Sequence, residues 1–265
     1  MSENRIETRL AQLQKDDKKA LITYVTAGLP TLKKTIELII AQDEAGVDII
    51  EIGVPFSDPV ADGPVIQDAS FRSIQNGTNL RNTFDTIETA RKSSNVPIVF
   101  MMYYNTISYY GLDKFAAKCA AVGVDGLIIP DLPFEEQGYL QDAIAKVENA
   151  PILIQLVAPV SKQRIPMLIE NARGFVYCVS QMGVTGNGAN FHKDIKEYLA
   201  NVKSIAKIPI MMGFGIKTAA DVLPLRDEID GAIVGSAFIR LLEENDFDVN
   251  VAKEYVTTFK KELNA

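Results

Sequence analysis

The chain has 265 residues, of which 47% are hydrophobic and 23% charged, and this composition excludes a disordered chain, a coiled coil and a collagen-like fibre. The formal net charge of -7 argues against non-specific binding of nucleic acid, because there is no excess of Lys and Arg to neutralise phosphates. The apolar runs are far shorter than a membrane span, and the polar first residues do not resemble a secretory signal. Two cysteines are too few for a disulfide framework, so we expect a cytoplasmic protein.

The predicted elements begin with a helix. Ile6, Leu10 and Leu13 are spaced at i, i+4 and i+7, which is the pattern of an amphipathic helix, and we expect it to pack on the outside of the domain. Eight apolar runs rich in Ile, Val, Leu or Met follow and are predicted as buried parallel strands: 21–26, 47–53, 98–103, 126–130, 152–157, 175–179, 208–212 and 232–234. Helical periodicity lies between some of them, over 32–45, 82–92, 113–121 and 135–147.

This alternation predicts an α/β fold. Eight strands and intervening helices in a chain of this length favour a single closed (β/α)8 TIM barrel with an extra N-terminal helix, forming one domain over residues 1–265. An open doubly wound sheet is the alternative, but the first turn after a strand, 26–30, lacks the G-x-G-x-x-G fingerprint of a dinucleotide fold. The long interval between the second and third strands predicts an elaborate loop there.

Carboxylates mark the second strand and the loop after it. Barrel enzymes carry their chemistry at the carboxyl ends of the strands. Glu51 interrupts an apolar run, where a carboxylate is costly to bury, so it belongs either to a functional site or to a structural salt bridge. Asp58 and Asp62 follow in a loop rich in proline, and each taken alone is typical of turn capping. Two carboxylates in different surroundings suit acid–base work with separated pKa values.

Glycines follow the last three predicted strands. The segment 183–188 after the sixth strand is typical of a lid or of an ordinary glycine-rich loop. Gly213 and Gly215 follow the seventh strand, and Gly235 and Ser236 follow the eighth. Barrels commonly bind phosphate at these two strand ends, because the missing side chains let backbone N–H groups face the anion.

Several kinds of chemistry find little support. His192 is the only histidine, which argues against a His-based triad and a histidine metal site. There is no Cys-x-x-Cys or Walker A pattern, and no lone lysine lies inside a predicted strand where a Schiff base would form. We therefore expect a barrel without metal or cofactor that holds a phosphate and uses carboxylates.

A long segment carries a specific resemblance. Residues 51–67, EIGVPFSDPVADGPVIQ, closely resemble the signature of the tryptophan synthase alpha chain family. The likeness extends over essentially the whole chain, through 24–28, 102–105, 129–133, 183–186, 213–215 and 235–236.

This resemblance implies a TIM-barrel lyase that cleaves indole-3-glycerol phosphate to indole and glyceraldehyde 3-phosphate by a retro-aldol reaction. It implies that Glu51 is the catalytic acid and base, that Asp62 interacts with the indole N–H, and that Tyr177 lines the site and supports catalysis. It also implies two groups of substrate-binding residues: Tyr24, Met101, Tyr103 and Phe214 around the indole, and Gly186, Gly215, Gly235 and Ser236 at the phosphate.

Members of the family work with a beta chain in an α2β2 complex, and indole passes through a tunnel to that chain. The resemblance implies that Asp58 lies in a loop facing the beta chain and that Thr185 lies in a lid over the substrate. Pyridoxal phosphate belongs to the beta chain, so no cofactor is expected on this chain.

The sequence departs from the family pattern at some positions, and other functions stay open. Leu29 replaces a common Asp, Gln181 lies in an unusual lid sequence, and Met101 suggests a different pocket wall. The alternatives are a free-standing lyase that releases indole, a non-catalytic partner that only activates a beta chain, and another phosphosugar enzyme on the same fold.

Overall fold

The computed structural model describes residues 4–179, 189–213 and 215–265. Within these residues nine parallel strands form one sheet in the order β5-β4-β3-β2-β1-β9-β8-β7-β6. The strands are β1 (Ala20–Thr26), β2 (Ile49–Gly53), β3 (Ile98–Met101), β4 (Gly126–Ile128), β5 (Ile152–Leu153), β6 (Gln155–Val157), β7 (Val176–Val179), β8 (Ile210–Gly213) and β9 (Gly231–Val234).

The sheet closes into a barrel through the chain itself. Its two edge strands, β5 and β6, are separated by the single residue Ile154. The backbone N–H of Ile154 donates to the carbonyl of Leu127 at 2.9 Å, which continues the pairing with β4. The predicted strand 152–157 is thus divided because its first part pairs with β4 and its last part pairs with β7. The closed barrel is confirmed, and the open doubly wound sheet is wrong.

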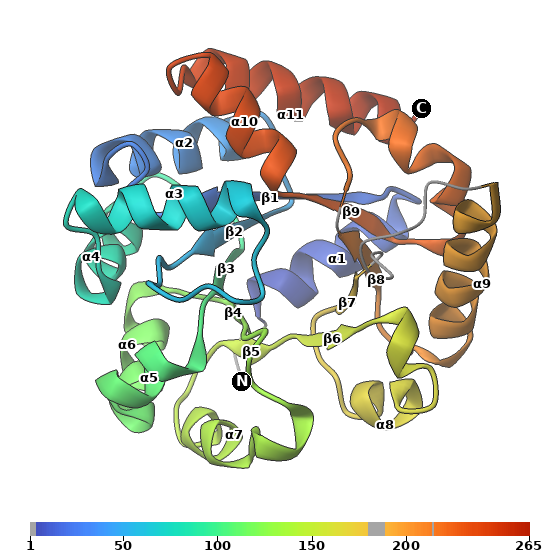
Figure 1. Ribbon diagram of the computed structural model, residues 1–265, viewed down its shortest axis with the longest axis horizontal. Coiled ribbons are helices and arrows are strands. Elements are labelled where there is room, and N and C mark those ends of the chain that lie inside the picture. Colours follow the sequence, from blue (N-terminus) through green and yellow to red (C-terminus); the bar gives the residue numbers. More distant parts are fainter. Residues whose placement is uncertain (1–3, 180–188, 214) are drawn as a thin grey trace.

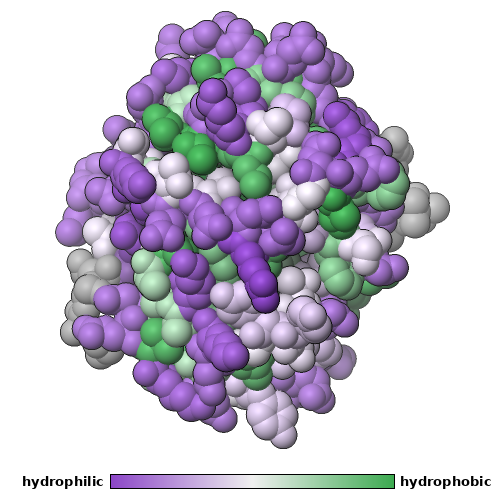
Figure 2. Space-filling view, turned by 90° about the vertical axis from the view of Figure 1, so that its left-hand side faces the viewer, coloured by the Kyte–Doolittle hydropathy of each residue, from purple (hydrophilic) through white to green (hydrophobic). Residues whose placement is uncertain are grey.

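Helices surround the barrel as an outer ring (Figure 1). They are α2 (Leu32–Glu44), α3 (Pro64–Gln75), α4 (Leu80–Ala90), α5 (Tyr104–Tyr110), α6 (Leu112–Val122), α7 (Gly138–Ala145), α8 (Ile165–Ile169), α9 (Ala189–Ile205), α10 (Ser236–Glu244) and α11 (Val249–Leu263), with 3₁₀ turns η1 (Phe134–Glu136), η2 (Pro159–Ser161), η3 (Ala219–Asp221) and η4 (Leu223–Glu228). The long interval between β2 and β3 holds both α3 and α4. Figure 2, which looks onto the left-hand side of Figure 1, shows a mostly hydrophilic outer surface with small scattered apolar groups. None of the described helices is long and apolar enough to cross a membrane.

The N-terminal helix α1 (Arg5–Lys15) covers one opening of the barrel. Ile6 and Leu10 are 0% and 3% exposed and belong to one cluster with inward-facing strand residues such as Ile22 and Val99. In Figure 1, α1 lies behind the ring of strands and not among the outer helices. The expected position on the outside of the domain is therefore wrong, because the apolar stripe of this helix fills the bottom of the barrel.

Two aspartates that end Gly-Val-Asp segments hold α1 against the strand starts. Asp48 accepts the backbone N–H of Leu21 at 2.7 Å through one oxygen and the Arg9 guanidinium at 2.6 Å through the other. Asp125 accepts the Arg5 guanidinium at 2.8 Å in the same manner. These charge-assisted hydrogen bonds fix the closed end of the barrel, so the open end is left for the site.

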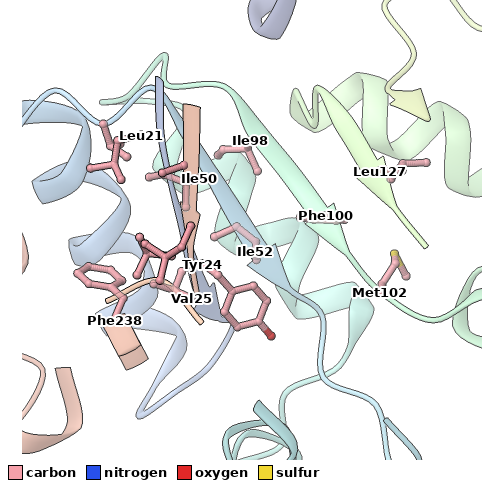
Figure 3. Packing of buried hydrophobic residues seen from close by; sticks show 14 of the residues in the cluster. Leu21, Tyr24, Val25, Ile50, Ile52, Ile98, Phe100, Met102, Leu127 and Phe238 are labelled. Carbon is pink, nitrogen blue, oxygen red and sulfur yellow. The ribbon is translucent and has the colours of Figure 1, made fainter. Parts of the chain in front are cut away.

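Alternation along the strands decides which side chains enter the barrel. In β1, Val25 lies on the side of Phe238 from α10, whereas the ring of Tyr24 lies on the other side of the strand (Figure 3). In β2, Ile49 belongs to the interior cluster and Ile50 to the cluster between strands and helices. Two residues beyond Ile49, Glu51 therefore faces the interior, one level nearer to the open end.

Candidate active site

Glu51 is a buried carboxylate in the barrel interior. Its side chain is 1% exposed, and one of its oxygens, Oε1, has no hydrogen-bond partner. No Lys or Arg of the described residues forms an ion pair with it, so a structural salt bridge does not explain it. Burial raises the pKa of Glu51 from 4.5 to about 8. At neutral pH the group therefore holds a proton that it can donate.

Two buried tyrosines lie near Glu51 in the barrel interior, one from the adjacent strand β1 and one from β7, further around the barrel. Tyr24 in β1 pairs in register with Glu51, and Tyr177 lies in β7. A Cβ built on Gly53 would lie 2.5 Å from Cζ of Tyr24, and one built on Gly213 would lie 2.6 Å from Cζ of Tyr177. Each ring therefore occupies the space left by a glycine at the end of another strand. Burial raises the pKa of both hydroxyls above the ordinary tyrosine value, so both stay protonated.

Asp62 comes from the loop between β2 and α3, and Tyr103 holds it. The hydroxyl of Tyr103 donates to Oδ2 of Asp62 at 3.0 Å and accepts the backbone N–H of Ala61 at 2.9 Å. The ring of Phe56 stacks on Tyr103 with centroids 5.0 Å apart. Burial raises the pKa of Asp62 to about 6, and the hydrogen bond from Tyr103 lowers it in part. Asp62 is thus mostly ionised at neutral pH.

A cavity of about 230 Å³ brings most of the predicted site residues together. It is lined by all three catalytic candidates, Glu51, Asp62 and Tyr177. It is also lined by five of the predicted substrate-binding residues, Tyr24, Met101, Gly215, Gly235 and Ser236.

The remaining predicted residues have other positions. Tyr103 is not among the lining residues and supports Asp62 instead. Asp58 is exposed in the loop before Asp62 and does not reach the cavity. Three predicted residues lie outside the described part of the chain: Thr185, Gly186 and Phe214.

One end of the cavity suits an anion. Gly235 is the N-cap of α10, and Ser236 is the first residue of that helix. The first turn of a helix presents backbone N–H groups and a partial positive charge. Gly215 faces them after β8 with a φ of 77°, in the left-handed region that favours glycine, and open space surrounds it. The residues and the helix end fit a phosphate group.

Sequence reasoning missed two cationic lining residues, Lys217 and Arg240. Arg240 lies one helical turn beyond Ser236, and Lys217 lies two residues beyond Gly215, so the glycine pattern was the signal that could have found them. The other missed lining residues are small or apolar and carry no chemical signal: Ala61, Gly63, Ile66, Ile216, Ile233 and Ala237.

Comparisons with known proteins agree with this geometry. The family model described as tryptophan synthase alpha chain matches residues 10–265. The chain belongs to the tryptophan synthase alpha chain family. The tryptophan synthase alpha chain of Lachnospira eligens is 66% identical over 263 residues, which is 99% of this chain and 100% of that one. The alpha chain of Clostridium kluyveri is 46% identical over 90% of both chains.

Solved structures of the family share the fold. The alpha subunit from Legionella pneumophila has a TM-score of 0.88 and 30% identity and covers 99% of both chains. A tryptophan synthase structure from Mycobacterium tuberculosis has a TM-score of 0.87 and 31% identity and covers 98% of this chain and 99% of that one. As a member of this family, the chain is a carbon–carbon lyase that cleaves indole-3-glycerol phosphate, so an unrelated phosphosugar activity on the same fold is excluded.

Proposed function

We propose that this chain cleaves indole-3-glycerol phosphate in the cavity of about 230 Å³, with Glu51 as acid and base and Asp62 as the anion at the indole nitrogen. The observation that carries this proposal is the pair of carboxylates on one cavity with pKa values near 8 and 6. Between these values Glu51 is protonated while Asp62 is ionised. Two carboxylates kept in opposite states can divide acid and anion roles.

The retro-aldol step needs one proton to leave a hydroxyl and one to reach a carbon. Glu51 donates its proton to indole C3, which places a positive charge on the ring nitrogen. Asp62 accepts the indole N–H and stabilises that charge. The carboxylate of Glu51 then takes the proton of the glycerol hydroxyl next to C3. The carbonyl forms, the bond to C3 breaks, and its electron pair restores the aromatic indole, so Glu51 ends protonated as it began.

The rest of the cavity binds the two ends of the substrate. Tyr24, Tyr177 and Met101 come from three different strands and supply aromatic and thioether surface for the indole. The first turn of α10 and Gly215 receive the phosphate at the other end. Because the phosphate does not change during the reaction, these contacts bind substrate and transition state equally.

We further propose that the partner is a tryptophan synthase beta chain in an α2β2 complex. Family membership supports this, and pyridoxal phosphate belongs to that beta chain. The exposed position of Asp58 in the loop that carries Asp62 is consistent with a surface that couples partner binding to the site. We also propose that residues 1–265 act as one domain and that the protein works in the cytoplasm.

The test measures indole release from indole-3-glycerol phosphate, with and without a purified beta chain. We expect slow release that increases on adding the beta chain and is lost in Glu51→Gln. Glu148→Gln changes an exposed carboxylate that lines a different cavity, near Arg5, and should behave as wild type.

Three results would contradict parts of the proposal. Fast release that the beta chain does not change would indicate a free-standing lyase. Unchanged release in Glu51→Gln would remove the assigned acid and base. Activation of the beta chain without any cleavage by this chain would indicate a non-catalytic partner.

A further inference from the structure

The anion end of the cavity carries two full positive charges besides the helix end. Lys217 and Arg240 line the same cavity as Gly215 and Ser236, and both side chains are exposed. Within the described residues, neither side chain forms an ion pair or a hydrogen bond. In contrast, Arg72 on the neighbouring helix α3 pairs with Glu243 of α10 at 2.5 Å. Neither cation is therefore held by an ion pair, although the nearby Asp221 carboxylate, which accepts the backbone N–H of Lys217, offsets part of the Lys217 charge.

Helix geometry directs Arg240 toward the phosphate position. Arg240 is four residues beyond Ser236 in α10, so the two residues lie on one face of the helix. Side chains in a helix lean toward its N-terminus and cover the preceding turn. A side chain as long as that of Arg240 can therefore reach over Ser236 toward the first turn, and Arg240 does line the cavity.

Lys217 approaches from a different element. It follows Gly215 in the segment between β8 and η3, and its backbone carbonyl accepts the hydroxyl of Tyr255 from α11 at 2.6 Å. This hydrogen bond fixes the backbone while the side chain stays available. The cavity therefore has a cation on each of two separate elements at its anion end.

These charges oppose the net charge of the whole protein. The chain carries a formal charge of -7, whereas a phosphate monoester carries a charge of about -1.5 to -2 at pH 7. The helix end offers only about half a positive charge. Two full cations near the ligand add to the charge of the helix end. At short range they outweigh the net negative charge of the chain, because the field of distant charges is screened within about 10 Å at 0.1 M salt.

We propose that Lys217 and Arg240 are substrate-binding residues that hold the phosphate charge of the substrate. The inference rests on the proposed function, because it concerns the same cavity. The cations act on the unreactive end of the substrate, so they strengthen binding without changing the chemical step.

The test replaces each cation by a neutral side chain and compares KM with kcat for indole release. Lys217→Gln and Arg240→Gln should each raise KM about fivefold, the factor that corresponds to about 1 kcal/mol for one partly exposed charge pair, with kcat unchanged. The double variant should raise KM further. Lys217→Arg and Arg240→Lys keep the charge and should keep KM within about twofold of wild type.

Inorganic phosphate and indole serve as separate probes of the two ends. Inhibition by inorganic phosphate should weaken in parallel with KM, and the loss should shrink at high salt. Inhibition by uncharged indole should stay unchanged, which excludes general damage to the pocket. Lys92→Gln removes an exposed lysine near the start of β3, at the other end of the barrel, and should match wild type throughout.

The outcomes separate this inference from the proposed function. If wild type cleaves the substrate but the neutral variants keep the KM and the phosphate inhibition of wild type, the inference is wrong and the proposed function stands. An equal rise of KM in the charge-keeping variants would also overturn it. If wild type cleaves nothing, the proposed function fails, while inorganic phosphate binding by calorimetry still tests the cations on their own.

Discussion

Replacing Glu51 by glutamine should stabilise the fold at neutral pH while it removes the activity. Burial raises the pKa of Glu51 from 4.5 to about 8. The folded chain thus keeps this proton up to about pH 8, whereas the unfolded chain loses it near pH 4.5. Between these values the folded state binds more protons, so stability falls by about 1.4 kcal/mol for each pH unit as pH rises. Glutamine does not titrate, so the Glu51→Gln variant does not lose this stability as the pH rises.

The magnitude follows from the two pKa values. From pH 4.5 to pH 7, Glu51 should lower the free energy of unfolding of wild type by about 3 kcal/mol relative to Glu51→Gln. Urea denaturation of both proteins at the two pH values measures this difference, and Glu148→Gln, which removes an exposed carboxylate, serves as the matched control. If the gap between wild type and Glu51→Gln is the same at both pH values, Glu51 does not hold a raised pKa, and the reasoning from its burial is refuted.

Three further predictions concern the same cavity. A plot of kcat/KM for indole release against pH should be bell-shaped, with apparent pKa values near 6 and 8, because the reaction needs ionised Asp62 and protonated Glu51. The value should fall about tenfold by pH 5 and by pH 9. A flat profile would contradict these roles. Tyr103→Phe removes the hydroxyl that lowers the pKa of Asp62, so the acid limb of that profile should move to higher pH while the basic limb stays. Gly53→Ala should lower kcat about 100-fold by displacing the Tyr24 ring, and steady-state kinetics should show partial recovery when Tyr24→Leu is added.

Much of the barrel could be predicted because it depends on local patterns. Near-continuous apolar runs identified the strands, and helical periodicity identified α2, α4 and α6. The division of the run 152–157 could not be predicted, since it depends on which neighbour each residue pairs with. The position of α1 also depends on the closed sheet: an amphipathic stripe shows that a helix buries one face, but not which surface receives it.

The residues of the candidate site were likewise predictable only where a local pattern marks them. Glu51 was predictable because a carboxylate within an apolar strand has few structural uses. Asp62 taken alone is typical of turn capping, so it was expected only from the family resemblance. The function of Tyr103 as the support of Asp62 was not, since the two residues are 41 positions apart in sequence and meet only when the loop after β2 folds over β3. Arg240 was missed because an arginine within a surface helix has many ordinary uses.

The roles of the glycines at the strand ends could least be predicted from the sequence. A glycine at the end of a strand is usually explained by a turn that needs its backbone freedom. Neither Gly53 nor Gly213 has a positive φ, and each instead leaves space that the tyrosine of another strand fills. The ring of Tyr24 covers the position above Glu51 only because β2 has no side chain at that level. The burial that raises the pKa of Glu51 is thus completed in part by the packing of Tyr24 from β1 against Gly53 of β2, a residue with no side-chain chemistry of its own.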